Sequence, residues 1–162
     1  MLERIAQAHE YMQGGPHPGL TRLSKAAKHT LGNVPTCRVA SRRGRVHVLW
    51  GERFMREFLL TDEDVAYVIW HEMAHMKLRH QIRAGFVGAL LYPERAYLWN
   101  LGADLEVEQY LEDLRDIRPE FAVRIDAGAR DPLTQVTFDP AVFREGERAE
   151  DYYVLLRQLV GI

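Results

Sequence analysis

The stretch DVAYVIWHEMAHMKLRHQ, residues 64–81, contains the HExxH spacing of a zinc site. On a helix, His71 and His75 lie four residues apart and therefore on one face, so both imidazoles can point at one metal ion. Glu72 is rotated by about 100° from His71 around the helix axis. This rotation predicts that Glu72 lies beside the ion, where it can take a proton from water. The spacing thus predicts a metal-binding helix that also carries a general base.

Apolar residues surround this motif on nearly every side of the predicted helix. A helix that is hydrophobic all round is buried. Two imidazoles and a carboxylate in a buried helix are unfavourable unless they have a partner, and a metal ion is such a partner. The alternative, that the spacing arose by chance on an ordinary helix, stays open on the motif alone. The apolar neighbours are Val65, Val68, Ile69, Trp70, Met73, Ala74, Met76 and Leu78.

A polar stripe marks a second helix, which is predicted to begin at Pro93. In AYLWNLGADLEVEQYLEDL, residues 96–114, the side chains of Asn100, Asp104 and Glu108 follow one another at intervals of four, flanked by leucine and valine. Acids inside an apolar face are not typical of a solvated helix. The stripe therefore predicts that this helix supplies the missing metal ligand.

Asp104 is predicted to be the third metal ligand, after His71 and His75. Glu108, one turn further on, would accept the free ring N–H of a ligand histidine and fix its tautomer, as carboxylates beside zinc sites do. Asn100 would hold the loop or a ligand from the other side. Two alternatives stay open: the roles of Asp104 and Glu108 are exchanged, or these acids belong to a generally acidic surface together with Glu106, Glu112 and Asp113.

The remaining periodicities predict an α+β fold, in which a small β-hairpin or sheet packs on a helical core around the buried helix. From Thr36 to Trp50 the apolar residues alternate, which predicts the hairpin. Its second strand, Arg45–Trp50, is expected at the edge of the sheet, where an extended substrate could pair with it. Thr61 and Asp64 predict a capping box at the start of the central helix.

Helical spacing also predicts a helix over the first dozen residues, one over about Leu20–Leu31 and one over Glu147–Val160. The central helix is expected to continue through Arg83. Leu114–Pro140, rich in Pro, Gly and Asp, is predicted to be mostly loop with one short strand, a flap over the site. Two histidines outside the motif, His17 and His29, are expected at the surface.

The composition is that of one soluble globular domain over residues 1–162, with 47% hydrophobic and 27% charged residues. A formal net charge of −2 gives no electrostatic reason to expect nucleic acid as a partner. Basic residues nevertheless cluster before Trp50, which indicates a solvated surface or, as the weaker alternative, an acidic partner. They are Arg22, Lys25, Lys28, Arg38, Arg42, Arg43 and Arg45.

The single cysteine, Cys37, excludes an intrachain disulfide framework and a cysteine-rich zinc site. It is consistent with a cytoplasmic protein. The N-terminal residues lack the apolar core of a signal peptide. The apolar piece Ala84–Tyr92 is far shorter than the roughly 20 residues that span a membrane. A cytoplasmic location without a membrane partner is therefore expected.

Four segments resemble the N-terminal metallopeptidase domain of the VWA-like metallopeptidases of bacteria and phages. They are the hairpin with GERF, the helix HEMAHMKLRHQIR, the segment WNLGADLEVEQYL and the later GERAEDYYVLL, together spanning about Thr36 to Leu156. The resemblance implies a zincin-like fold and metallopeptidase activity, with the two HExxH histidines and Asp104 as ligands. The chain departs from the family pattern at Glu108, where Asn is usual, and the von Willebrand-type domain of longer relatives does not follow in this sequence.

Together these features predict a zinc-dependent peptidase that acts on a peptide or protein substrate. Zn²⁺ would be held by His71, His75 and Asp104, with Glu72 as the general base that later delivers a proton to the leaving amine. Two other functions stay open: a catalytically idle metal-binding scaffold, and a zinc hydrolase that acts on a non-peptide bond. The candidates for stabilising an oxyanion are Tyr97, Tyr110 and Arg79.

Overall fold

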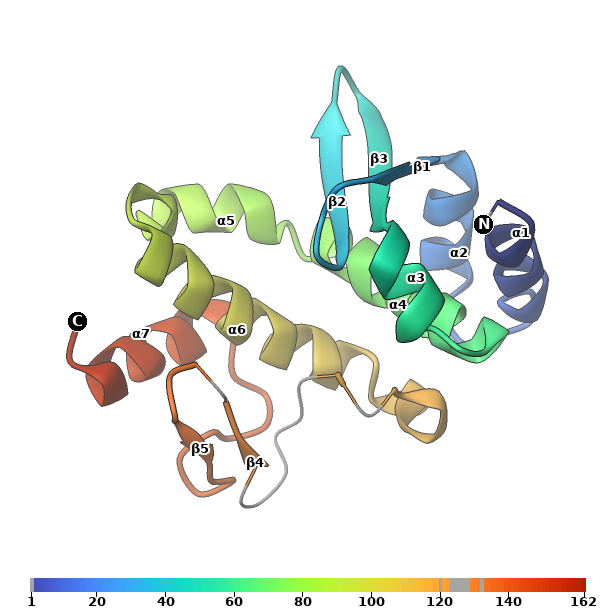
Figure 1. Cartoon of the computed structure of the whole chain (residues 1–162). Coiled ribbons are helices and arrows are strands. Elements are labelled where there is room, and N and C mark those ends of the chain that lie inside the picture. The colour runs from blue at the N-terminus through green and yellow to red at the C-terminus, as the bar shows by residue number, and fades with distance from the viewer. Residues whose placement is uncertain (1, 120, 123–128, 132) are drawn as a thin grey trace. The chain divides into compact units, whose positions relative to one another are not determined.

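The structure, a computed structural model of the chain, describes residues 2–119, 121–122, 129–131 and 133–162 (Figure 1). The fold is α+β, as predicted, with many helices and a small mixed sheet of three strands. No helix in the described ranges combines the length and the apolar character that a membrane span requires.

The chain forms two compact units. The first is made of Met1–Lys77 and Asp113–Glu120, and the second of Leu78–Glu112 and Phe121–Ile162. The expected single metallopeptidase domain over residues 1–162 stays a prediction.

The first unit contains the three-stranded sheet. β3 (Arg45–Gly51) lies in the middle, parallel to β1 (Lys28–Gly32) on one side and antiparallel to β2 (Cys37–Arg42) on the other. The prediction that Arg45–Trp50 is an edge strand is therefore wrong, because β1 and β2 form the edges. The helices of this unit are α1 (Leu2–Tyr11), α2 (Pro18–Ala26), α3 (Glu52–Glu57) and α4 (Asp62–Lys77).

The predicted helix over Leu20–Leu31 is wrong in its C-terminal part. The α2 helix ends at Ala26, and the chain then turns into β1. Along its whole length β1 pairs with β3 through backbone hydrogen bonds. This pairing with a strand distant in the sequence outweighs the local helical pattern.

The start of α4 confirms the predicted capping box. Thr61 Oγ1 accepts a hydrogen bond from the backbone N–H of Asp64 (3.0 Å), and Asp64 Oδ2 accepts one from the backbone N–H of Thr61 (2.8 Å). The helix ends at Lys77. Arg79 has left-handed backbone angles, with φ of 59°, and a separate helix, α5 (His80–Phe86), begins after it. The prediction of one continuous helix is therefore wrong.

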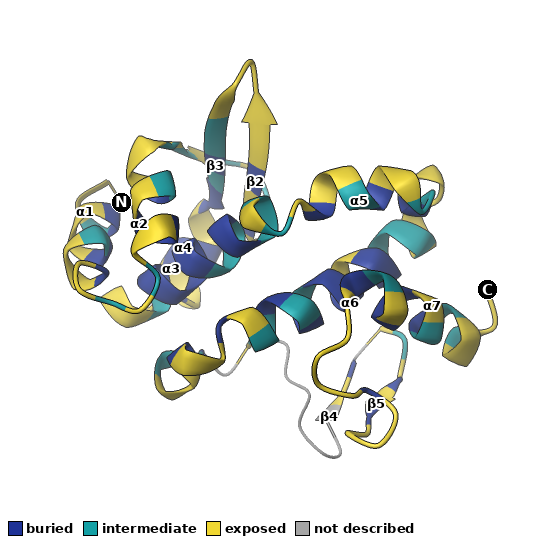
Figure 2. Cartoon of the chain, turned by 180° about the vertical axis from the view of Figure 1, so that it is seen from behind, coloured by how far each residue is buried: buried dark blue, intermediate teal, exposed yellow. Residues whose placement is uncertain are grey.

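Half of the residues of α4 are buried (Figure 2). Trp70 is buried as well, and its indole N–H donates to Thr21 Oγ1 on α2 (3.3 Å). Burying a large apolar side chain stabilises a fold by about 1.5–3 kcal/mol relative to leaving it exposed. Packing therefore fixes α4 within the first unit more strongly than helix propensity does. The α4 side chains with no exposed area are Val65, Ala66, Ile69, Met73 and Ala74.

A chain of hydrogen bonds joins α1, α2, β1 and β3. The Trp50 indole N–H donates to His29 Nδ1 (3.1 Å), so the ring proton of His29 is on Nε2, which donates to the carbonyl oxygen of Ser24 (3.0 Å). The hydroxyl of Ser24 lies 2.8 Å from His9 Nε2. The prediction that His29 lies at the surface is wrong, because its ring ties the sheet to α2.

We expect the protein to lose stability as the pH falls from about 6.5 to about 4. Burial, reinforced by the charges of His29 and Lys25, lowers the pKa of His9 from 6.5 to about 4, and burial also lowers the pKa of His29. The unfolded chain binds these protons near the ordinary pKa of 6.5, so the stabilisation is complete above that pH and is lost progressively below it. Thermal denaturation at a series of pH values should show a decrease in melting temperature on the order of a few degrees.

The His9→Gln variant is the control for this pH dependence. Glutamine keeps an acceptor for the Ser24 hydroxyl but does not titrate in this range. The decrease in melting temperature between pH 7 and 4 should therefore be smaller in the variant than in the wild type. An equal decrease in both proteins would show that His9 does not contribute.

The second unit is organised around α6 (Pro93–Tyr110), which packs along α7 (Ala149–Val160). The two helices approach closely at Gly102, where a Cβ atom would lie 3.0 Å from the carbonyl oxygen of Ala149 and 3.1 Å from the backbone nitrogen of Tyr153. Any larger residue at this position would push them apart. The predicted helices from Pro93 and over Glu147–Val160 are confirmed to within a few residues. Core side chains of this unit include Trp99, Leu105, Phe138, Phe143 and Tyr152.

The region predicted as loop, Leu114–Pro140, contains several short elements. They include part of η2 (Glu112–Ile117) and an antiparallel pair, β4 (Ala129–Arg130) with β5 (Thr137–Phe138). Near the start of η2, Asp113 Oδ1 lies 2.7 Å from His17 Nε2, and the His17 side chain is only 13% exposed rather than at the surface. The predicted flap includes residues 120, 123–128 and 132, which lie outside the described residues, and it stays a prediction.

Candidate metal centre

The α4 helix places His71 and His75 on one face, as their spacing predicts. The two Nε2 atoms lie 3.0 Å apart, and the ring centroids lie 4.7 Å apart. Both residues are half-buried. A single helix of the first unit therefore brings two imidazole nitrogens to one point, away from full contact with solvent.

This histidine pair fits a zinc ion. Two Zn–N bonds of about 2.0–2.1 Å at a tetrahedral angle place their nitrogens about 3.3 Å apart. The 3.0 Å between His71 Nε2 and His75 Nε2 is close to that value. A metal ion accepts a lone pair from each nitrogen, whereas a direct hydrogen bond between the rings requires one of them to donate a proton. Spacing and donor chemistry both suit a metal such as Zn²⁺.

Glu72 follows His71 on α4 and is also half-buried. Burial, and secondly the charge of the Glu72 carboxylate, raises the pKa of the Cys37 thiol on β2 well above its ordinary value. With no metal ion beside it, Cys37 therefore stays a neutral thiol at neutral pH and is a poor nucleophile. Of Cys37 and Glu72, the Glu72 carboxylate is the group that can accept a proton.

The other three predicted site residues lie on α6, in the second unit. Asp104 and Glu108 are half-buried, whereas Asn100 is exposed. Half-buried acids at these two positions agree with a polar stripe set in an apolar helix. Asp104 as the third ligand, Glu108 beside a ligand histidine, and a supporting role for Asn100 stay predictions.

Tyr97, one of the candidates for stabilising an oxyanion, already donates its hydroxyl proton to another group. The acceptor is Asp131 Oδ2, at 2.6 Å. The other carboxylate oxygen of Asp131 accepts from the backbone N–H and the hydroxyl of Thr134, both at 2.7 Å. Burial, this hydrogen bond and the charge of Asp104 together raise the pKa of Tyr97. Tyr97 therefore holds the Asp131 loop on α6 and is a poor oxyanion donor.

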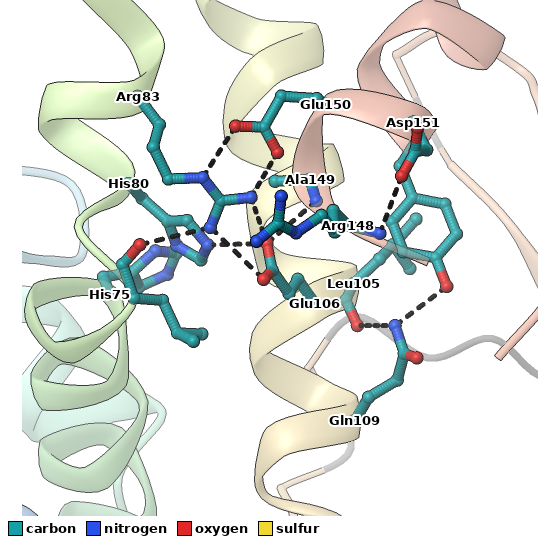
Figure 3. Close-up of polar contacts among 12 residues, drawn as sticks. His75, His80, Arg83, Leu105, Glu106, Gln109, Arg148, Ala149, Glu150 and Asp151 are labelled. Carbon is teal, nitrogen blue, oxygen red and sulfur yellow. Dashed lines mark hydrogen bonds and ion pairs between the residues drawn. The ribbon is translucent and has the colours of Figure 1, made fainter. Parts of the chain in front are cut away.

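A half-buried ion network connects α5, α6 and α7 within the second unit (Figure 3). Arg83 donates to Glu150 Oε1 (2.7 Å) and lies 2.9 Å from Glu106 Oε2. His80 Nε2 (3.0 Å) and the backbone N–H of Ala149 (2.8 Å) also donate to Glu106 Oε2. Burial alone would raise the pKa of Glu106, but these hydrogen bonds outweigh it and lower the pKa to about 2.

The sequence pattern does not predict this network, because it places Glu106 on a generally acidic surface. Glu106 lies two residues after Asp104 and about 200° around the helix axis, so the two carboxylates leave opposite sides of α6. The charge of Glu106 also suits the start of α7, where the backbone N–H of Ala149 has no acceptor within its own helix and donates to Glu106 instead. The position of Glu106 on the side of α6 opposite the polar stripe is the sequence signal for this network, because it separates Glu106 from the other acids of the helix.

Comparisons of the chain with protein-family models, with curated proteins and with solved structures find no match. The resemblance to the VWA-like metallopeptidases stays a prediction based on the four sequence segments.

Proposed function

We propose that the protein is a zinc-dependent peptidase with a zincin-like arrangement of its site. The observation that carries the proposal is the 3.0 Å separation of His71 Nε2 and His75 Nε2 on α4, with Glu72 next to them on the same buried helix. Two imidazoles at this spacing and an adjacent carboxylate are the elements that the helix of such a metallopeptidase supplies.

Asp104 completes the proposed ligand set. With His71 and His75 it offers two imidazole nitrogens and one carboxylate oxygen, a set that suits Zn²⁺ and leaves a fourth position for water. Glu108, one turn further along α6, would accept the ring N–H of a ligand histidine. Asn100, exposed on the same helix, would hold the neighbouring loop.

Glu72 acts as the proton carrier in the proposed reaction. When bound, zinc lowers the pKa of a water molecule to about 7 and so supplies a nucleophile at neutral pH. The Glu72 carboxylate takes the proton that the water loses as it attacks the peptide carbonyl carbon. The Glu72 carboxyl then gives this proton to the leaving amine nitrogen and is ionised again at the end of the cycle. The packing of α4 keeps Glu72 and the two histidines in register throughout.

We expect the purified protein to contain about one zinc ion per chain, because two histidines and one carboxylate form a typical catalytic zinc set. Elemental analysis of the dialysed protein measures this directly. His75→Gln should lose the metal, whereas His47→Gln, a change at a half-buried histidine of the sheet, should keep it. A wild-type protein that holds no transition metal and takes up none when zinc is added would refute the proposed function.

A further inference from the structure

The first unit carries a concentration of positive charge that the proposed peptidase site does not use. Between Glu10 and Glu52 the sequence contains no Asp or Glu, but it contains seven Lys and Arg residues. The net charge of −2 conceals this asymmetry, because the acids lie elsewhere in the chain. Four of the seven cations, Arg38, Arg42, Arg43 and Arg45, lie in the hairpin formed by β2 and β3.

Strand register places Arg38, Arg42 and Arg45 on the solvent side of the hairpin. Arg42 pairs directly with Arg45, and directly opposed residues of an antiparallel pair share one face. Arg38 lies four residues before Arg42 on β2 and therefore on the same face. The other face carries the pair Val39 and Val48, which are both buried. The arginine face is thus the one turned away from the core.

The hairpin tip is exposed on both of its faces. Every residue from 40 to 45 is exposed, and the tip extends away from the helices of the first unit (Figures 1 and 2). In the described part of the chain, no acid forms an ion pair with Arg42, Arg43 or Arg45. The three guanidinium groups are therefore available to a partner.

Two features of the tip oppose its own folding. The directly opposed like charges of Arg42 and Arg45 destabilise the strand pair. Arg43 and Gly44 both have positive φ, 50° and 73°, as in a type I′ turn, where Asn, Asp or Gly is the usual first residue. An arginine in this left-handed conformation also reduces stability. Arg42, Arg43 and Arg45 therefore occupy positions at which an arginine lowers the stability of the hairpin. Arginines at such positions indicate that their charge has a function.

We propose that the β2–β3 hairpin binds the phosphate backbone of a nucleic-acid duplex. The planar guanidinium group of an arginine can donate hydrogen bonds to two phosphate oxygens at once. A two-stranded ribbon fits the major groove of B-DNA, which is about 12 Å wide. The exposed tip, Ala-Ser-Arg-Arg-Gly-Arg, has no aromatic ring to stack on unpaired bases and no large apolar side chain to anchor a protein interface. These absences favour a duplex over a single strand or a protein segment.

Fluorescence anisotropy with a short labelled DNA duplex of mixed sequence tests this proposal. The wild-type protein should bind, and its affinity should fall by about two orders of magnitude between about 50 mM and 200 mM salt, as four phosphate contacts require. The variant Arg42→Gln, Arg43→Asn, Arg45→Gln should bind at least about tenfold more weakly at the lower salt concentration, with a much shallower salt dependence. It should melt at or above the wild-type temperature, because the like-charge pair and the left-handed arginine are gone.

The variant Arg22→Gln, Arg53→Gln, Arg56→Gln is the matched control. It removes three exposed arginines of the same unit outside the hairpin and changes the net charge equally. It should keep duplex affinity within about threefold of wild type. The proposal would be overturned if the wild-type protein bound no duplex at low salt, or if both variants lost duplex affinity equally. It would also be overturned if the wild-type protein bound polyglutamate as tightly as the duplex, because the hairpin would then be assigned to an acidic protein partner. None of these readouts depends on zinc or on hydrolysis, so they are independent of the proposed peptidase function.

Discussion

Replacing Glu72 with Gln is expected to lower the kcat/KM for peptide hydrolysis by at least about a hundredfold. Glutamine keeps the size and polarity of the side chain, but its amide cannot take a proton from water. His71, His75 and the packing of α4 are unchanged, so zinc content and melting temperature should stay at their wild-type values. Cleavage of a quenched fluorescent peptide library, elemental analysis and calorimetry on the same preparations measure all three quantities.

Glu63→Gln provides the matched control, because Glu63 is an exposed acid in the first turn of the same helix. It should hydrolyse peptides at the wild-type rate. If Glu72→Gln retains full activity, another group is the base. If the wild-type protein holds zinc but cleaves no peptide in the library, the alternative of a catalytically idle metal-binding scaffold replaces the peptidase.

The most predictable part of the structure was α4, because its determinants are local. The capping box of Thr61 and Asp64 needs only residues three apart, and the convergence of His71 and His75 needs only the helix period. Burial of α4 could also be predicted, because apolar residues surround the motif. These features are predictable because one turn of helix sets both the contacts and their geometry.

The errors in the fold concern contacts between residues far apart in the sequence. A helix was expected where β1 forms, and β1 occupies the side of β3 that was expected to be a free edge. The bonds from Trp50 to His29 and from His29 to Ser24 help to hold that strand in place, yet neither is visible in a local pattern. At Arg79 the error is of another kind, because a single left-handed residue ended a helix that periodicity alone would extend.

The environments of the acids of α6 could be predicted from the sequence only in part. Asp104 and Glu108 lie on the predicted polar stripe and are half-buried. This burial is what the proposed roles of a metal ligand and its supporting carboxylate require. Glu106 was assigned to the surface, but Arg83, His80 and the start of α7 hold it. Its partners come from 23 to 43 residues away, so periodicity within α6 could not distinguish this structural acid from a solvated one.

Asp104→Ala is expected to reduce zinc affinity by more than about a hundredfold, because it removes a proposed ligand rather than a supporting group. It should also abolish most of the stabilisation by zinc. Ligand binding to the folded state alone contributes about 4 kcal/mol at a thousand times the dissociation constant, so zinc bound at the proposed site would contribute binding free energy to folding. Competition titrations with a chromophoric chelator and thermal denaturation with and without zinc measure the two effects.

Glu108→Ala and Glu94→Ala complete this comparison. Glu108→Ala should lose about 10- to 100-fold in zinc affinity, the usual effect of removing a carboxylate that orients a ligand histidine. Glu94→Ala removes an exposed acid from the first turn of the same helix and should leave zinc affinity unchanged. The order of the first two losses decides between the two assignments. If Glu108→Ala empties the site while Asp104→Ala binds zinc at wild-type affinity, Glu108 is the third ligand and Asp104 supports it.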